Sequence, residues 1–171
     1  MVSVEIRRQD AIGQDLERQL AEWTEAIFGA EELKYGWAEQ HWRVLVYFEG
    51  QLASTLAITE REAIVGGRGV TLAGIGNVMT PPQWRRRGLA ARAMQEAAGF
   101  LRDELRVDFG FILCSHDLIP YYQRLGWQQV KAPVVFDQPT GKVQWQEEAM
   151  ALPCAQHTWP DGTVDLCGLP W

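Results

Sequence analysis

Apolar and polar residues alternate along the chain with two different periods, which separate predicted helices from predicted strands. Two segments repeat apolar residues about every four positions, as expected for a helix with one buried face. The first stripe consists of Leu16, Leu20, Trp23 and Ile27, and the second of Leu89, Ala93, Ala97, Leu101 and Leu105. The first helix is expected to begin near Asp10 and to end at Gly29, because glycine readily adopts the backbone conformation that ends helices.

Short runs of β-branched and apolar residues predict the strands. These runs cover residues 4–8, 44–48, 51–58, 70–80, 108–114, 130–136 and 144–152, and residues 61–65 extend the third run or begin another. Glu49 and Gly50 join two strands in a tight hairpin, and a short helix is expected over residues 118–125. Strands that alternate with helices, with hairpins at both ends, indicate an α/β fold: a mixed sheet with helices on both faces.

Length and composition limit the class of protein. The 171 residues have the size of one domain, assigned to residues 1–171. Hydrophobic residues make up 47% of the chain and charged residues 22%, as is typical of a soluble globular protein. Residues 1–8 lack the apolar core of a signal peptide, and no apolar run approaches the ~20 residues of a membrane span. We therefore expect a cytoplasmic protein without a membrane partner.

The charge balance and the cysteines exclude further classes. A formal net charge of −6 disfavours a nucleic-acid-binding protein, which usually needs a broad basic surface. Cys114, Cys154 and Cys167 are an odd number of cysteines without a C-x-x-C pair. This pattern argues against both a disulfide framework and a structural zinc site. We expect buried thiols and no metal.

A strand that contains glycines leads into a helix through a basic turn, and this junction carries the clearest chemistry. Gly74 and Gly76 weaken the strand over residues 70–80 and predict a bulge or a close backbone approach. The next segment, Arg85-Arg86-Arg87-Gly88-Leu89-Ala90, enters a helix whose first N–H groups lack partners within the helix. Such a turn can hold a pyrophosphate, which the positive helix end and the arginines attract. An exposed basic helix start is the alternative interpretation.

The order of Arg85, Gly88 and Ala90 resembles R/Q-x-x-G-x-G/A, the acyl-CoA signature of the GNAT superfamily of N-acetyltransferases. The resemblance implies a GNAT-like mixed sheet with a bulged central strand, and acetyl-CoA as co-substrate. It also implies that the bulged strand binds the pantetheine arm and the thioester carbonyl through Val78, Met79 and Thr80. The implied pyrophosphate site consists of Arg85, Arg86, Arg87, Gly88, Leu89, Ala90 and Ala91.

A second motif, Tyr121-Tyr122-Gln123-Arg124-Leu125-Gly126-Trp127, resembles the GNAT sequence F-Y-x-x-L-G-F. Its register selects Tyr122, because neighbouring helical residues point in different directions. The resemblance implies that the Tyr122 hydroxyl protonates the departing CoA thiolate, and that Ser115 holds the cofactor or the tyrosine. The alternative roles are a core aromatic for Tyr122 and a helix cap for Ser115, although Asp117 is the expected cap.

The acceptor side of the site is less clearly marked. The Leu-Gly-Trp ending of the second motif and the final Trp171 resemble aminoglycoside 2′-N-acetyltransferases, in which a terminal carboxylate helps bind the cationic sugar. Gly76 stands where such enzymes carry a strand glutamate that acts as the base. The candidate substitutes for that base are Glu39, Asp165 and His116, and the predicted substrate-binding residues are Glu39, Asp165 and Trp171.

These motifs predict an acetyl-CoA-dependent N-acetyltransferase that transfers acetyl directly to a small primary amine, such as an amino sugar or an aminoglycoside. Direct transfer needs no nucleophilic side chain, so Cys114 is not required as an acyl carrier. A longer-chain N-acyltransferase and a non-catalytic acyl-CoA sensor are the two alternatives. The expected partner is a small molecule rather than a nucleic acid or a membrane, and a homodimer is compatible with the sequence.

Overall fold

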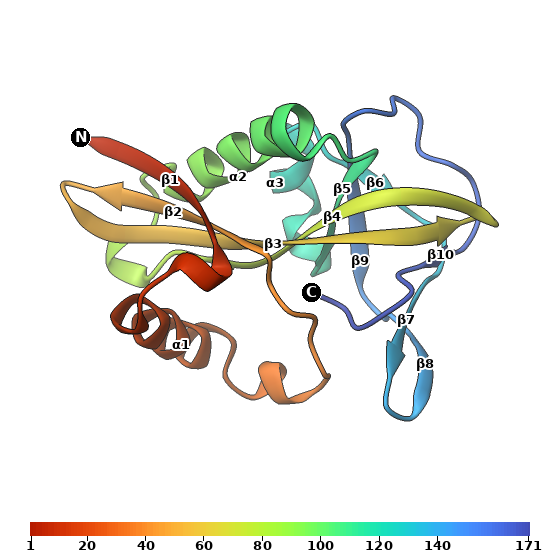
Figure 1. Cartoon of the computed structure of the whole chain (residues 1–171), viewed down its shortest axis with the longest axis horizontal. Helices are drawn as coiled ribbons and strands as arrows, with labels where there is room; N and C mark the ends of the chain where they lie inside the picture. The colour runs from red at the N-terminus through yellow and green to blue at the C-terminus, as the bar shows by residue number, and fades with distance from the viewer.

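The computed structural model describes all of residues 1–171, and ten strands form one mixed sheet in it (Figure 1). The strands are β1 (Val2–Arg8), β2 (Trp42–Phe48), β3 (Gln51–Val65), β4 (Arg68–Met79), β5 (Phe109–Cys114), β6 (Gln128–Val130), β7 (Val134–Gln138), β8 (Gly141–Gln144), β9 (Glu148–Pro153) and β10 (Val164–Asp165). Their order is β6-β9-β5-β4-β3-β10-β7-β8, and β2 pairs with both β1 and β3. The predicted α/β class and mixed sheet are confirmed.

Three α-helices and five shorter helical segments connect the strands. The α-helices are α1 (Gln14–Phe28), α2 (Leu89–Phe100) and α3 (Ile119–Arg124). The shorter segments are η1 (Gln9–Ala11), η2 (Gly29–Leu33), η3 (Pro82–Trp84), η4 (Leu101–Leu105) and η5 (His116–Leu118). Helix α1 lies on one side of the sheet, and α2 and α3 lie on the other (Figure 1). None of these helices is both long enough and apolar enough to cross a bilayer.

The two predicted helical stripes pack on opposite faces of the sheet. On the α2 face, the buried residues include Leu89, Ala93, Ala97, Leu101, Val44, Val46 and Ile75. On the α1 face, Leu20 packs with Leu45 and Met79. Strand β2 therefore sends alternate side chains to opposite faces, as the period of a strand requires. A third cluster around Phe109, Phe111 and Phe136 fills the far end of the sheet.

Strand β4 carries a bulge. Opposite β3, Thr55 pairs with Met79 and Ala57 pairs with Gly76, so β4 has one more residue than β3 between these pairs. Asn77 lies in the bulge and has a left-handed backbone with φ of 47°. The bulge reverses the alternation: Ile75 and then Val78 pack on the α2 face, whereas Met79 packs on the α1 face.

Strands β4 and β5 separate at the same level as the bulge. Their parallel pairing runs from Leu72 and Phe109 to Ile75 and Ile112. Beyond this point β4 continues to Met79 and β5 to Cys114 without pairing to each other. The unpaired ends therefore leave main-chain groups free at the centre of the sheet.

Several predicted boundaries differ from the structure. The single strand expected over residues 130–136 is two strands, because Pro133 has no N–H to donate and the two halves have different neighbours, β9 and β10. A hairpin near the C-terminal end is expected from the sequence, and β7 and β8 form one, but β8 ends at residue 144, where the predicted strand begins. The first helix begins at Gln14 rather than near Asp10, because residues 9–11 form the separate turn η1. Residues 61–65 extend β3, and Gly29 ends α1 with φ of 52°.

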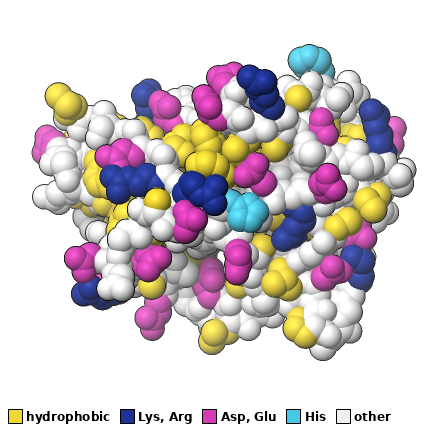
Figure 2. Space-filling model, viewed as in Figure 1, with side chains coloured by type: hydrophobic (Ala, Val, Ile, Leu, Met, Phe, Trp, Pro, Cys, Tyr) yellow, Lys and Arg dark blue, Asp and Glu magenta, His cyan; other side chains and the backbone are white.

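The surface mixes charges of both signs. On the face shown in Figure 2, Asp and Glu side chains lie between Lys and Arg side chains, with small hydrophobic areas among them. On this face, the acidic side chains are therefore interspersed with basic ones rather than gathered in one patch.

Candidate active site

A cavity of about 400 Å³ lies where β4 and β5 separate. We call it the gap cavity. Its walls include residues 75–78 of β4 and residues 112–114 of β5. Tyr122 lines it from the α3 side of the sheet, and Glu32 and Tyr35 line it from the α1 side. Because both sides contribute residues and the strands are unpaired here, the cavity connects the two faces of the sheet.

Tyr122 is 4% exposed, and none of the side-chain hydrogen bonds of the protein involves its hydroxyl. Burial, and then the nearby Cys114, raises the pKa of Tyr122. The phenol is therefore protonated at neutral pH and has a proton to donate. Tyr121 points elsewhere: its ring meets that of Tyr122 edge to face, and it is absent from the lining of the gap cavity.

Two further polar groups of β5 and its continuation line the gap cavity. Burial, and then the charge of Glu148, raises the pKa of the Cys114 thiol to about 12. Cys114 is thus a neutral thiol and a poor nucleophile at neutral pH. The Ser115 hydroxyl donates to Asp117 Oδ1 at 2.5 Å. The expected cap at Asp117 is wrong: Asp117 lies within η5, and the N-cap position of α3 is occupied by Leu118, which has no side-chain hydrogen bond to offer.

The basic turn after β4 leads directly into α2. Gly88 is the N-cap of α2 and has φ of 74°, and Arg86 has φ of 59°. The Arg92 N–H donates to Gly88 O at 3.0 Å. The N–H groups of Leu89 and Ala90 precede this bond and have no partner within the helix. Left-handed residues near a free helix start form a concave set of main-chain donors suited to an anion.

Two arginines of this turn are held by the protein. The Arg85 side chain donates through Nε to Thr80 O at 2.9 Å. The Arg87 guanidinium lies over the rings of Phe48 and Trp84, at 5.1 and 5.6 Å from their centroids. Both contacts fix the turn against the end of β4 and the β2–β3 hairpin.

The three strand residues predicted to bind the pantetheine differ in their surroundings. Val78 lines the gap cavity. Met79 is fully buried and its carbonyl accepts a hydrogen bond from Ser54 Oγ at 3.1 Å. Thr80 Oγ1 lies 2.8 Å from the same Ser54 oxygen. Val78 is therefore the residue of the three that faces the cavity.

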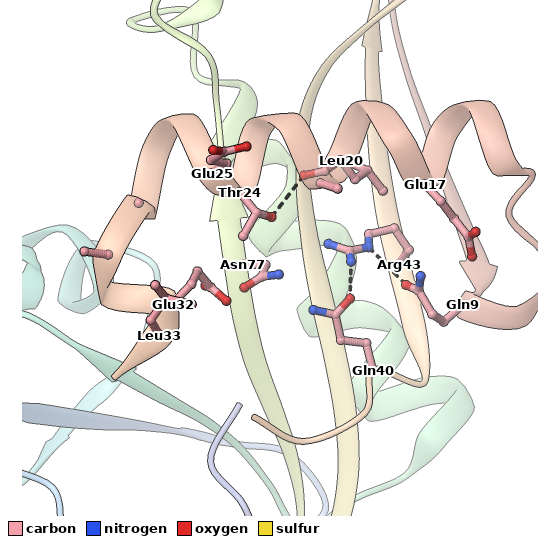
Figure 3. A pocket seen from close by; sticks show the side chains of 13 residues that line it. Gln9, Glu17, Leu20, Thr24, Glu25, Glu32, Leu33, Gln40, Arg43 and Asn77 are labelled. Atoms are coloured by element: carbon pink, nitrogen blue, oxygen red, sulfur yellow. Dashed lines mark hydrogen bonds between the residues drawn. The ribbon is translucent and has the colours of Figure 1, made fainter. Parts of the chain in front are cut away.

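A second cavity of about 890 Å³ lies under α1 (Figure 3). We call it the α1 cavity. It is bounded by α1, η2, β2 and the bulge of β4, and Glu17, Glu25 and Glu32 contribute carboxylates to it. Glu32 and Asn77 line both this cavity and the gap cavity, so the two adjoin at these residues. In Figure 3, the side chains of Glu32 and Asn77 lie next to each other in the middle of the α1 cavity. Burial raises the pKa of the Glu32 carboxyl.

The C-terminal segment closes one side of this region. A β-carbon on Gly74 would lie 1.9 Å from the Trp171 ring, and one on Gly76 would lie 2.9 Å from the Trp171 main chain. Trp171 Nε1 donates to Phe111 O at 3.2 Å, and Pro170 O accepts from the Ala38 N–H at 2.7 Å. The close approach predicted for the strand glycines is thus made by Trp171, whereas the bulge falls at Asn77.

The structure brings together some of the residues predicted from the sequence and separates others. Tyr122, Ser115, Val78 and Trp171 line the gap cavity. Glu39 is exposed on the loop before β2, and its carbonyl accepts from Thr59 Oγ1. The remaining two candidates are paired elsewhere, since Asp165 binds Lys142 Nζ at 2.8 Å and His116 binds Glu148 at 2.8 Å.

Sequence reasoning missed two residues of the α1 cavity, Glu32 and Arg43. Glu32 belongs to an acidic segment whose sequence predicts an exposed surface. Its position beside the bulge depends on how α1 and η2 pack onto the sheet. The single signal for Arg43 was its position as a charged residue next to an apolar strand run.

Comparison with known proteins assigns this arrangement. A family model described as an acetyltransferase (GNAT) domain matches residues 2–130. The chain belongs to the GNAT acetyltransferase family. The matched residues contain the basic turn, both sides of the gap cavity and Tyr122, whereas β7–β10 and Trp171 lie beyond the match. No curated protein matches the chain.

Solved GNAT-like structures share the fold at low sequence identity. ElaA from Escherichia coli is similar with a TM-score of 0.64 and 13% identity, over 89% of this chain and 99% of that one. An acyl-CoA N-acyltransferase from Pseudomonas aeruginosa has a TM-score of 0.60 and 15% identity, over 89% and 99% of the two chains. A GNAT family acetyltransferase from Brucella melitensis, in complex with acetyl-CoA, has a TM-score of 0.60 and 16% identity, over 95% and 94%.

Proposed function

We propose that the protein transfers the acetyl group of acetyl-CoA directly to a small primary amine. The observation that carries the proposal is the gap cavity, which joins both faces of the sheet and is lined by Tyr122 and by the bulge of β4. The acyl donor enters from the α2 and α3 side, and the amine from the α1 cavity. The Brucella melitensis GNAT acetyltransferase in complex with acetyl-CoA supports the choice of donor.

The donor is held mainly by main-chain groups. The diphosphate binds the free N–H groups at the start of α2, over residues 85–91, with Gly88 allowing close approach. The pantetheine arm runs along residues 78–80, and Val78 is the residue that it meets in the gap cavity. The unpaired ends of β4 and β5 leave N–H groups of the bulge free to stabilise the oxyanion of the tetrahedral intermediate.

Glu32 is the general base in this proposal. Among the carboxylates of the α1 cavity it is the one that also lines the gap cavity, and its raised pKa increases its basicity. Glu32 takes a proton from the ammonium group, directly or through one water. The resulting amine attacks the thioester carbonyl, and the carbon–nitrogen bond forms before the carbon–sulfur bond breaks.

Tyr122 is the general acid. As the carbon–sulfur bond breaks, the CoA thiolate takes the Tyr122 hydroxyl proton. The attacking nitrogen loses its second proton to water, and the phenolate takes up a proton from water. Burial raises the pKa of Tyr122, which keeps the phenol protonated but also makes it a weaker acid. The transfer therefore requires that the thiolate form in the same desolvated cavity, where it too becomes more basic. Ser115, next to Cys114 in the lining, is a positioning residue in this scheme. The neutral Cys114 thiol forms no acyl intermediate.

The carboxylates of Glu17, Glu25 and Glu32 suit a cationic amine, which amino sugars, aminoglycosides and amino acids all carry. Trp171 forms one wall of the site next to Gly76. The experiment is a panel of amines with acetyl-CoA, followed by release of free thiol; the panel contains aminoglycosides, polyamines, amino acids and peptide N-termini.

Tyr122→Phe is the matched variant, since it removes one oxygen. It should lower kcat by about 10²-fold, as expected for loss of a general acid, with the calorimetric affinity for acetyl-CoA nearly unchanged. Tyr121→Phe, next to it but outside the cavity lining, should keep full activity. Acetyl-CoA binding without thiol release for any amine would instead favour an acyl-CoA sensor. Faster release from longer acyl-CoA donors would favour a longer-chain acyltransferase.

A further inference from the structure

Arg43 of β2 is a buried cation without an acidic partner. Its residue is 3% exposed, and it makes no salt bridge. Two of its five N–H donors are used: Nε donates to Gln9 Oε1 at 3.3 Å, and Nη2 donates to Gln40 Oε1. Nη1 is buried and has no hydrogen-bond partner. In Figure 3, the guanidinium nitrogen without a dashed line points toward Thr24 and Asn77, into the α1 cavity.

An unpaired charge in this position is unfavourable for the folded protein. Burial lowers the pKa of Arg43 to about 10, so the side chain is still cationic at neutral pH. Neutral amide oxygens of Gln9 and Gln40 solvate it in part but leave its charge uncompensated. Buried charges in proteins are usually paired. An anion in the α1 cavity would supply the missing partner.

The position of Arg43 relates it to the reaction centre. Ala57 of β3 pairs with Arg43 on one side and with Gly76 on the other. Residues directly opposite each other point to the same face, so Arg43 and Gly76 share the α1 face, two strand spacings or about 10 Å apart. The Arg43 side chain extends across part of this distance within the α1 cavity. A small molecule whose anionic group binds Arg43 could therefore reach the gap cavity with an amine only a few covalent bonds away from that group.

We infer that the acceptor amine carries a carboxylate, which binds Arg43 in the α1 cavity, and that the substrate class is amino acids. This inference rests on the proposed acetyl transfer. The free donors on Nη1 and Nη2 can meet a planar carboxylate in the forked geometry that arginine favours. The nearby Glu32 favours a cationic amine at the other end. Arg43 and Glu32 thus match the two ends of a zwitterion, and the carboxylates of Glu17 and Glu25 disfavour a ligand with several negative charges.

The test compares each of the common amino acids with its carboxamide, in which a neutral amide group of nearly the same shape replaces the carboxylate. For the best acceptor, the wild-type protein should have a kcat/KM for the acid at least about 10-fold higher than for the amide. Arg43→Met should lower kcat/KM for the acid by about 10²-fold, as expected when one partner of a buried charge pair is removed. Its kcat/KM for the amide should change by less than about threefold. Arg43→Lys, which keeps the charge but not the fork, should lie between the two.

Two controls separate binding from folding. Arg18→Met removes an exposed arginine of α1 that pairs with Asp15, and should change neither acid nor amide kinetics. The affinity of Arg43→Met for acetyl-CoA should equal that of the wild-type protein. If Arg43 serves the fold alone, Arg43→Met will lower Tm and reduce acid and amide turnover equally. Our inference predicts an unchanged or raised Tm, because an unpaired buried charge has been removed.

Calorimetric titration of the same acids and amides into the CoA-bound protein tests the site without turnover. If the wild-type protein binds acids in preference to amides and Arg43→Met loses this preference, the carboxylate site is supported. If no thiol is released from the same mixtures, the carboxylate site still stands, but the proposed acetyl transfer is contradicted. Equal use of acids and amides by the wild-type protein would overturn the inference while leaving acetyl transfer intact. Preference for aminoglycosides or polyamines over every amino acid would also overturn it.

Discussion

The contact between Gly74 and Trp171 makes a sharp prediction about stability. An alanine β-carbon at position 74 would lie 1.9 Å from Cε2 and 2.0 Å from Cδ2 of the Trp171 ring. Such distances are impossible, and a ring cannot bend out of the way. Gly74→Ala must therefore displace the Trp171 side chain from the sheet.

The expected loss follows from the contacts of Trp171. Its hydrogen bond from Nε1 to Phe111 O contributes about 1 kcal/mol. The edge-to-face contact with Phe111 and the Arg61 cation over the ring contribute about 1 kcal/mol each. Replacing a glycine within a strand returns about 0.5–1 kcal/mol. The net destabilisation is about 2 kcal/mol, or a fall in Tm of about 4–8 °C for a chain of this size.

Chemical denaturation and thermal unfolding measure this effect. Gly69→Ala is the matched control, because Gly69 lies in the same strand and a β-carbon there meets nothing within 4 Å. It should leave the free energy of unfolding unchanged or slightly raised. In a Trp171→Ala background, Gly74→Ala should also become neutral, which gives a coupling energy of about 2–3 kcal/mol. Equal effects of Gly74→Ala and Gly69→Ala in the wild-type background would refute the reasoning.

Two further predictions concern the proposed chemistry. Gly88→Trp should abolish acetyl-CoA binding in calorimetry, because the indole would block the free N–H groups at the start of α2. Gly88→Ala is the control, because alanine has the same left-handed backbone penalty of about 1–2 kcal/mol without the bulky side chain. Unchanged affinity of Gly88→Trp would remove the diphosphate from this turn. The raised pKa of Glu32 means that its base form is lost as pH falls through a value above the ordinary 4.5, so kcat/KM should show an acid limb that Glu32→Gln abolishes. When burial raises the pKa of a carboxyl, the folded protein becomes less stable as rising pH ionises that group. Glu32→Gln should therefore raise Tm at neutral pH, and should not raise it at a pH low enough to protonate the carboxyl. An unchanged acid limb in this variant would exclude Glu32 as the base.

Local patterns were enough to predict most of the elements around the site. The four-residue spacing of apolar side chains located α1 and α2. Gly29 after α1 and Gly126 after α3 have positive φ and mark the ends of these two helices. The turn at Glu49 and Gly50 has positive φ at both residues, as a tight hairpin between twisted strands requires. These features depend on residues close in sequence, so they can be recognised without knowing what packs against them.

Features that depend on distant parts of the chain were harder to predict. Gly74 and Gly76 correctly indicated a close approach, but the sequence did not show that the approaching group was Trp171. The burial of Arg43 depends on α1 lying over β2, and its position next to an apolar strand run does not show that a helix covers it. Likewise β10 forms by pairing with β3 and β7, which are remote from it in sequence.

The separation of β4 and β5 also constrains the order of events during turnover. Two molecules that reach the same opening from opposite sides of a sheet do not compete for an entrance, so neither has to depart before the other arrives. Initial rates measured while both concentrations are varied should therefore give intersecting double-reciprocal lines, the signature of a ternary complex. A double-displacement route through an acylated side chain would give parallel lines.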